Sequence, residues 1–198
     1  VKNCFSHHNR VAGIMGQNQV DMQVFNNSAH YNGHEKDGGT GYGVVLASGS
    51  VNVDCVITEN LVERNYRKGL DVHDAYTSEF RNNTSRGNRF FGIAIEGRGY
   101  PLSKCYITRN VFIQDPDFRL AVDDDHTAWA DSKNSDYYRW CAVRFEVNPQ
   151  ALFQTYKVPA VVDLQATENY ISGISWDGRG AHQAFIVANR EDDNGSVI

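Results

Sequence analysis

The sequence is poor in proline, lacks long apolar runs and carries no excess of positive charge. Only 4 of its 198 residues are proline, against 17 glycines and 18 asparagines, a mixture that favours many tight turns over long helices. No run of 18 apolar residues occurs, so no membrane-spanning helix and no insertion into a membrane are expected. The formal net charge of −5 argues against a nucleic-acid partner, which would require a basic patch or stripe.

A repeat with a period of 23 residues organises the middle of the chain. Each copy has an Asn-rich turn, a glycine and a short strand in which apolar residues alternate with others. A fixed period in the twenties is a signature of solenoid architectures. The two clearest copies contain Asn60, Asn65 and Gly69, and then Asn83, Asn88 and Gly92.

The pattern extends over the whole chain and predicts an all-β fold. About six copies are found, and a second strand with period-two alternation precedes each first asparagine. We expect residues 1–198 to form one solenoid domain, a piece of a longer chain. Asparagine suits the corners because it tolerates left-handed backbone and can form ladders between stacked strands. One stacked inward column is expected to contain Leu70, Ile93, Phe145 and Phe185.

None of the four cysteines shows CxxC spacing, which argues against a zinc site or a thioredoxin-type motif. Cys55 and Cys105 hold the same place in their copies, two copies apart. Because strands in a ladder lie ~4.8 Å apart, their Cα atoms are expected roughly 10 Å apart, beyond disulfide reach. We expect reduced, buried thiols that act as small apolar residues.

Three copies carry insertions between the second asparagine and the following strand, at residues 33–40, 115–140 and 175–183. Insertions in repeat proteins map to loops on one face, which is often the binding face. These loops are therefore expected to protrude and to crowd beside the strand that follows them.

The pattern Asn-x4-Asn-x3-Gly-Ile, flanked by strands, resembles the right-handed parallel β-helix of the pectin-lyase-like superfamily. Within that superfamily, the runs GGTGYGVVLASGS, CVITENLVERNYRKGLDVHD and FRNNTSRGNRFFGIAIEGR resemble bacteriophage tailspikes and receptor-binding proteins. The resemblance implies a right-handed parallel β-helix of about six rungs with protruding loops. It also implies a homotrimer in a virion tail, outside the host cell, in contact with other tail proteins and with a host surface polysaccharide.

A second, local resemblance covers residues 69–74. The run GLDVHD is similar to the Gly-x-Asp-Pro-His-acid motif of mannuronan C5-epimerases, which carry a further carboxylate on the next rung, where Glu96 stands here. Val72 replaces the proline, and Arg67 and Lys68 occupy the place of the tyrosine that precedes the motif. Tyr66 and Tyr42 are the candidates to replace that tyrosine.

Outward positions of the strand after each glycine gather the candidate catalytic residues. Hydrolysis of a glycoside needs two carboxyls, one of which stays protonated through crowding; Glu96 with a second acid meets this need. Elimination or epimerisation needs a base and a cation that binds the sugar carboxylate, and His73 and Arg144 meet it. The alternative is a solvated sheet face with ion pairs between rungs. The candidates are Asp71, His73, Glu96, Arg144 and Glu146.

Side chains that could contact a polysaccharide lie on the loops beside this face, and aromatic rings among them suit stacking on sugars. No cofactor and no metal is expected, since the acidic run at residues 123–126 lacks the spaced ligand pattern of a calcium loop. The substrate-binding candidates are His34, Glu35, Arg98, Trp129, Tyr137 and Tyr138.

Three functions remain open. The first is a phage tailspike that binds and cleaves a host surface polysaccharide, as a glycoside hydrolase or a polysaccharide lyase. The second is a spike or fibre that binds such a glycan without cleaving it. The third is a free epimerase or lyase that acts on a uronic-acid polymer. Flanking sequence would separate them, because a trimerising or virion-attachment domain favours the first two.

Overall fold

The structure is a computed structural model that describes residues 1–34, 40–47, 49, 51–100, 102–115, 118, 140–147, 161–172 and 183–189. Within these ranges the regular secondary structure consists of strands, and no α-helix occurs. Accordingly, no helix in this part of the chain is long and apolar enough to cross a membrane.

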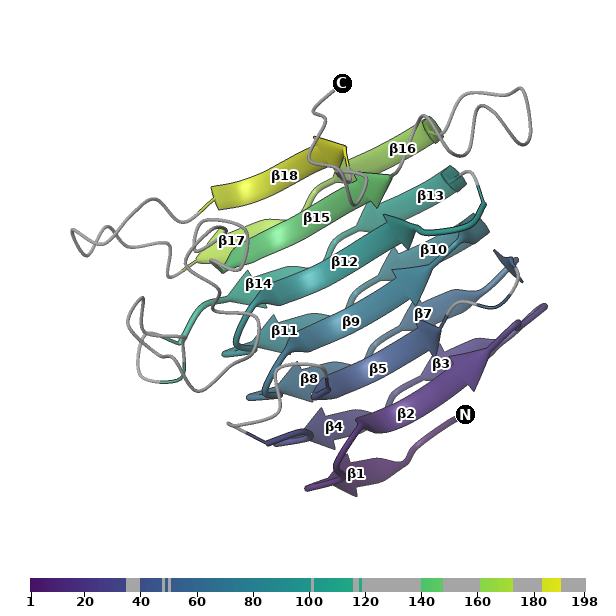
Figure 1. Ribbon diagram of the computed structural model, residues 1–198. Coiled ribbons are helices and arrows are strands. Elements are labelled where there is room, and N and C mark those ends of the chain that lie inside the picture. The colour runs from purple at the N-terminus through teal and green to yellow at the C-terminus, as the bar shows by residue number, and fades with distance from the viewer. Residues whose placement is uncertain are drawn as a thin grey trace, which may run out of the picture.

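The strands form three parallel sheets that wind into six stacked rungs (Figure 1). Sheet A contains β3 (Gln23–Phe25), β7 (Val56–Thr58), β10 (Ala75–Arg81), β13 (Leu102–Thr108) and β16 (Val161–Thr167), with β6 (Asn52–Val53) paired to β10. Sheet B contains β1 (Phe5–His7), β4 (Ser28–His30), β8 (Leu61–Glu63), β11 (Thr84–Arg86), β14 (Val111–Ile113) and β17 (Tyr170–Ser172). Sheet C contains β2 (Ala12–Gln17), β5 (Tyr42–Ala47), β9 (Lys68–His73), β12 (Phe91–Gly97), β15 (Cys141–Val147) and β18 (Gln183–Asn189).

This arrangement confirms the predicted parallel β-helix of about six rungs. The sequence predicted two strands in each rung, and the structure has a third. It lies between the two asparagines, where three residues such as Leu61–Glu63 pair with the rungs above and below. Such a segment is too short to show a clear alternation, which is why the sequence pattern did not reveal it.

Aligned columns of apolar side chains fill the interior. In sheet A, Ile57, Phe80 and Ile107 stack in register and are fully buried. In sheet C, Leu70 pairs with Ile93 and Ile93 with Val143.

One predicted column was wrong in detail. Phe145 pairs with Ile95, which is two residues along from the column of Leu70 and Ile93 and belongs to the next inward column, while Phe185 pairs with Val143. Phe145 still packs in the core, but Phe185 is 46% exposed. The predicted column was drawn through the bulky aromatic residues and not through the true register partners. Phe185 is exposed because β18 lies at one end of the described part of its sheet.

Two ladders of asparagine side chains hold the rungs together at the corners on either side of sheet B. In the first, Asn60 donates its backbone N–H and its Nδ2 to Asn83 Oδ1, at 3.0 and 2.9 Å. The next step up repeats both bonds to Asn110 Oδ1, at 2.9 and 3.0 Å. The side-chain amides thus form hydrogen bonds with backbone N–H groups at the turns. Without these bonds, the buried N–H groups would have lost their hydrogen bonds to water and gained none in return.

A column of glycines, Gly13, Gly43, Gly69 and Gly92, lies near the start of β2, β5, β9 and β12 in sheet C. A Cβ atom on Gly43 would lie 2.6 Å from the carbonyl oxygen of Gly69, and one on Gly69 would lie 2.6 Å from that of Gly92. Real Cβ atoms do not approach backbone this closely, so the glycine of the repeat is required by the tight contact between rungs. Ala142 ends the column, since its oxygen is the contact for Gly92.

The structure confirms the prediction that Cys55 and Cys105 are separate, buried thiols. Ser78 pairs with Cys105, and its Oγ accepts a hydrogen bond from the backbone N–H of Cys55 on the rung below at 3.3 Å, so one rung separates the two thiols. All four cysteines are free, and Cys55, Cys105 and Cys141 are buried, whereas Cys4 is exposed.

The ladder predicts a specific stability effect for Asn65→Ala. Asn65 Oδ1 accepts from Asn32 N and Nδ2 at 3.1 and 2.8 Å, and Asn65 Nδ2 donates to Ala29 O and Asn88 Oδ1. Alanine leaves these buried groups unpaired, so the free energy of unfolding should fall by at least about 2 kcal/mol. Urea unfolding measures the change.

Asn9→Ala is the matched control, because Asn9 is the exposed end of the same ladder. Water can replace the bonds that Asn9 loses, so its effect should be much smaller. Equal losses in the two variants would show that the buried amide bonds do not hold the rungs.

Candidate functional site

The outward face of sheet C carries the predicted candidate residues in the predicted order. Asp71, Ala94 and Arg144 form one column across three rungs, and His73, Glu96 and Glu146 form the next. The sequence left open a solvated face, but Asp71 is fully buried and Glu96 is only 6% exposed. Charged groups out of contact with water need partners, and the partners define the site.

One lysine at the start of β9 also reaches this face. Lys68 comes directly before Gly69 and is paired between Tyr42 and Phe91 on the neighbouring rungs. Its ammonium group lies 5.9 Å from the centre of the Tyr42 ring and 5.7 Å from that of Phe91. Both rings attract a cation through their negative faces, so the column provides a pocket for the Lys68 ammonium.

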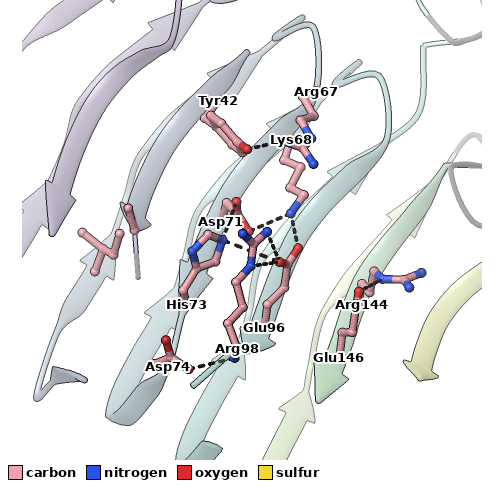
Figure 2. A network of polar contacts seen from close by, with 12 residues as sticks. Tyr42, Arg67, Lys68, Asp71, His73, Asp74, Glu96, Arg98, Arg144 and Glu146 are labelled. Carbon is pink, nitrogen blue, oxygen red and sulfur yellow. Dashed lines mark hydrogen bonds and ion pairs between the residues drawn. The ribbon is translucent and has the colours of Figure 1, made fainter. Parts of the chain in front are cut away.

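Five side chains from β9, β12 and the residues just after β12 form what we call the lysine cluster: Lys68, Asp71, His73, Glu96 and Arg98 (Figure 2). Lys68 Nζ donates to Asp71 Oδ1 at 3.0 Å and to Glu96 Oε1. His73 Nε2 lies 3.2 Å from Asp71 Oδ2 and 3.6 Å from Glu96 Oε2. Arg98 donates through Nε and Nη2 to Glu96 Oε2, at 2.8 and 2.6 Å.

Asp74 fixes the backbone that carries Arg98. One carboxylate oxygen, Asp74 Oδ1, accepts the backbone N–H groups of Arg98, Gly99 and Tyr100 at 2.8, 2.8 and 2.9 Å. Three such bonds to one charged oxygen orient the segment after β12. Arg98 is thereby turned back over Glu96, and its side chain, 33% exposed, borders the cluster on the solvent side.

The two carboxyl groups of the cluster are held ionised. Burial alone would raise the pKa of Glu96, but Lys68, Arg98 and His73 lower it well below its ordinary value. Burial likewise opposes ionisation of Asp71, and Lys68 outweighs it, so the pKa of Asp71 is lowered. Burial would lower the pKa of Lys68, yet Asp71 and Glu96 raise it above its ordinary value. The crowding expected to keep one carboxyl protonated is therefore overcome by the lysine between them.

Asp71, His73 and Glu96 are also a set of possible metal ligands, with ligand atoms within 4.8 Å of one another. Oxygen and imidazole ligands suit several divalent cations. In the cluster, however, Lys68 and Arg98 bind three of the four carboxylate oxygens, and His73 contacts the fourth. Two side-chain cations already balance the two carboxylates, so they fill the role that a divalent ion would take.

Arg144 and Glu146 lie on the next rung, on β15, and form a separate pair. Arg144 Nε donates to Glu146 Oε2 at 2.9 Å, and the guanidinium group lies 5.1 Å from the centre of the Phe91 ring. Figure 2 shows this pair apart from the lysine cluster, beyond β12. Glu96 and Glu146 are register partners on neighbouring strands, and each accepts hydrogen bonds from an arginine, Glu96 from Arg98 and Glu146 from Arg144.

The structure thus brings together Asp71, His73, Glu96 and Arg98 and sets Arg144 and Glu146 beside them. His34 is exposed, in a segment before β5. The sequence interpretation missed Lys68 and Asp74. Of the two tyrosines that it considered, Tyr42 pairs in register with Lys68 and accepts a hydrogen bond from Arg67, whereas the ring of Tyr66 packs against Phe118. Four predicted binding residues lie outside the described residues: Glu35, Trp129, Tyr137 and Tyr138.

The lysine cluster predicts a pH-dependent effect of Lys68→Met. At neutral pH the variant leaves two buried carboxylates without their main partner, a loss of about 3–5 kcal/mol. In the wild type, the lowered pKa of Glu96 gives stability that is present above about pH 4.3 and is lost as pH falls through the folded-state pKa. In the variant, burial raises the carboxyl pKa values, so stability rises as the pH falls and the carboxyls take up protons.

The difference between wild type and Lys68→Met should therefore shrink as the pH falls from 7 toward about 4.5, close to the ordinary pKa of glutamate. Urea unfolding at both pH values measures it. Lys104→Met, at an exposed position of β13, is the control and should change stability little at either pH. A loss in Lys68→Met that is equal at both pH values would contradict the proposed charge balance.

Comparison with known proteins identifies the fold family. The family model described as the right handed beta helix region matches residues 1–115, more than half of the chain. No curated protein and no solved structure matches. The matched residues contain β9, β12 and Arg98, so they include every member of the lysine cluster.

Proposed function

Since the chain belongs to the right-handed β-helix family, we propose that it binds a polysaccharide along the outward face of sheet C and cleaves it at the lysine cluster. The family's fold fits a protein that binds or depolymerises carbohydrate. One fold hosts many functions, however, so the argument for cleavage depends on the cluster itself.

The observation that carries the proposal is a set of buried charges placed outside the apolar core. Lys68 is 1% exposed and Asp71 is fully buried. Well-packed apolar residues at such positions usually give equal or greater stability than a buried ion network. Sheet C does use apolar residues in the same columns elsewhere, as at Val45 next to Asp71 and at Ala94. Perturbed, coupled ionisable groups gathered at one place are typical of catalytic sites.

The charge states favour elimination over hydrolysis. A glycoside hydrolase needs one carboxyl that stays protonated as the acid, and both carboxyls of the cluster have lowered pKa values. Elimination needs a base for the proton on C5 of a uronic acid and a cation for its carboxylate. Both arginines are paired with an acid, but the side chain of Arg98 is 33% exposed at the solvent border of the cluster, whereas Arg144 is 1% exposed, so Arg98 suits the carboxylate better.

In this scheme His73 is the base and Asp71 orients it. Asp71 Oδ2 accepts from His73 Nε2–H, and this tautomer places the lone pair of the ring on Nδ1. His73 removes the C5 proton, and the electron pair left on carbon forms the C4–C5 double bond. The bond between C4 and the glycosidic oxygen breaks, and the leaving oxygen takes a proton from water. Lys68 holds Asp71 and Glu96 in place throughout.

A second candidate, a spike that binds glycan without cleaving it, is favoured by the depth of the cluster. His73 is 5% exposed and Glu96 6%, so a substrate reaches them only after Arg98 moves away from Glu96. The two candidates differ in one outcome, the release of shortened products.

The activity test is incubation of the protein with capsular, O-antigen and uronic-acid polysaccharides, with products sized and examined for unsaturated ends. His73→Ala should lower the rate about 10²–10⁴-fold. Glu96→Gln should weaken it less, because Lys68 keeps Asp71 as a partner. Arg86→Gln, at an exposed position of β11, is the control and should act as wild type. Full activity in both cluster variants with the fold intact would place the site elsewhere, and intact polysaccharide throughout would favour the binding spike.

The resemblance of the Asn-rich repeats to phage receptor-binding proteins extends the proposal to the biological setting. The chain would form part of a virion tailspike, act outside the cell on a host surface polysaccharide, and contact other tail proteins. Such a spike would be a homotrimer with parallel solenoid axes. Light scattering on the full-length protein tests this: three copies are expected, and a clean monomer would favour a free epimerase or lyase.

A further inference from the structure

A polar hollow lies on the outer face of sheet A. Sheet A and sheet C, which carries the lysine cluster, are different walls of the solenoid (Figure 1). The hollow has a volume of about 270 Å³. Pockets for drug-sized ligands measure roughly 300–1,000 Å³, so this hollow has room for about one sugar ring. Its lining consists of Glu79, Arg81, Asn82, Tyr106, Thr108 and Arg109.

Strand register builds the hollow. Glu79 pairs with Tyr106 and Arg81 with Thr108 on β10 and β13, so these four side chains share the outer face. Phe80 and Ile107, between them in sequence, point into the core and are fully buried. The rigid interior column thus fixes the spacing of the outer side chains.

Residues at the corners after the two strands complete the lining of the hollow. Asn82 and Arg109 follow the two strands directly and have positive φ values of 54° and 57°. Arg109 Nε bonds Glu168 Oε2 at 2.6 Å, and Arg81 lies 3.6 Å from Glu79. Both pairs are largely exposed, and exposed pairs contribute little. The two guanidinium groups can therefore exchange these partners for an anionic ligand with little loss.

Tyr106 is held at the side of the hollow. Its hydroxyl group donates to Asp163 Oδ2 at 2.9 Å, and its ring is partly exposed. The Tyr106 ring lies next to a hydroxyl, an amide, two guanidinium groups and the Glu79 carboxylate, so the hollow offers an apolar surface and hydrogen-bonding groups within one small space.

We infer that this hollow binds one acidic sugar unit of a glycan, with Arg81 and Arg109 on its anionic group and the Tyr106 ring against its apolar face. A guanidinium group binds carboxylate in two parallel hydrogen bonds, which gives such a site preference for charged over neutral sugars. The inference does not depend on cleavage at the lysine cluster, because the residues concerned belong to a different sheet.

The test is calorimetric titration with hexagalacturonate as the acidic probe and maltohexaose as the neutral one, in the full chain. The double variant Arg81→Gln/Arg109→Gln should weaken binding of hexagalacturonate at least about tenfold, which is about 1.4 kcal/mol. Tyr106→Ser should weaken it further, and maltohexaose should bind poorly throughout. All three positions are on the surface, so the variants should fold, as thermal melting would check.

Arg86→Gln is the matched control, an exposed arginine on sheet B that is paired with Glu63. Equal weakening by Arg86→Gln, or no binding of hexagalacturonate to the wild type, would overturn the inference. Inorganic phosphate that competes as well as hexagalacturonate would also overturn it, in favour of a simple anion site. So would self-association that disappears in the double variant, because the face would then contact a second copy.

His73→Ala separates this inference from the proposed function. Hexagalacturonate binding that persists in His73→Ala but is lost in the double variant supports the hollow whether or not the protein cleaves polysaccharide. Binding that is lost in His73→Ala and kept in the double variant would assign the acidic sugar to the lysine cluster alone and overturn the hollow.

Discussion

The rest of the structure depends on the repeated stacking of rungs at one fixed spacing. Asparagine side chains bond from rung to rung, and glycines allow backbone contact that no Cβ would permit. Both requirements are local and recur from rung to rung, so they set the strand register wherever they are present. Once the register is set, the apolar columns of the interior follow from alternation, and so does the composition of each outward column.

The same stacking explains how the lysine cluster forms. Asp71 and His73 come from one rung and Glu96 from the next, so adjacent strands bring them into contact without any loop. Lys68 joins them from the start of the same strand, because its ammonium group bonds Asp71 and Glu96 and lies near the Tyr42 and Phe91 rings. A scaffold that is rigid by repetition thus holds the charged groups, and Asp74 adds three backbone bonds that orient Arg98.

Much of the fold could be predicted because period and alternation are visible in a single sequence. The Asn-x4-Asn-x3-Gly pattern fixed both corners, and the outward columns of Asp71, Glu96 and Arg144 were predicted correctly even across a long insertion. Lys68 was missed because simple alternation counts it with the inward Leu70, whereas its Nζ bonds the outward residues Asp71 and Glu96. The burial and the ionised state of Glu96 could not be predicted either, since both arise from contacts between separate rungs and not from local pattern.

The asparagine ladder is indifferent to how much chain separates its members. Successive bonded asparagines are 33, 23, 27 and 59 residues apart along the chain, yet the bonds have nearly the same length at each step. A rung therefore accepts an insertion of almost any size at its corner without a change in the register above or below. The loops of such a protein can diverge while the scaffold stays constant, so ligand specificity is free to evolve separately from folding stability.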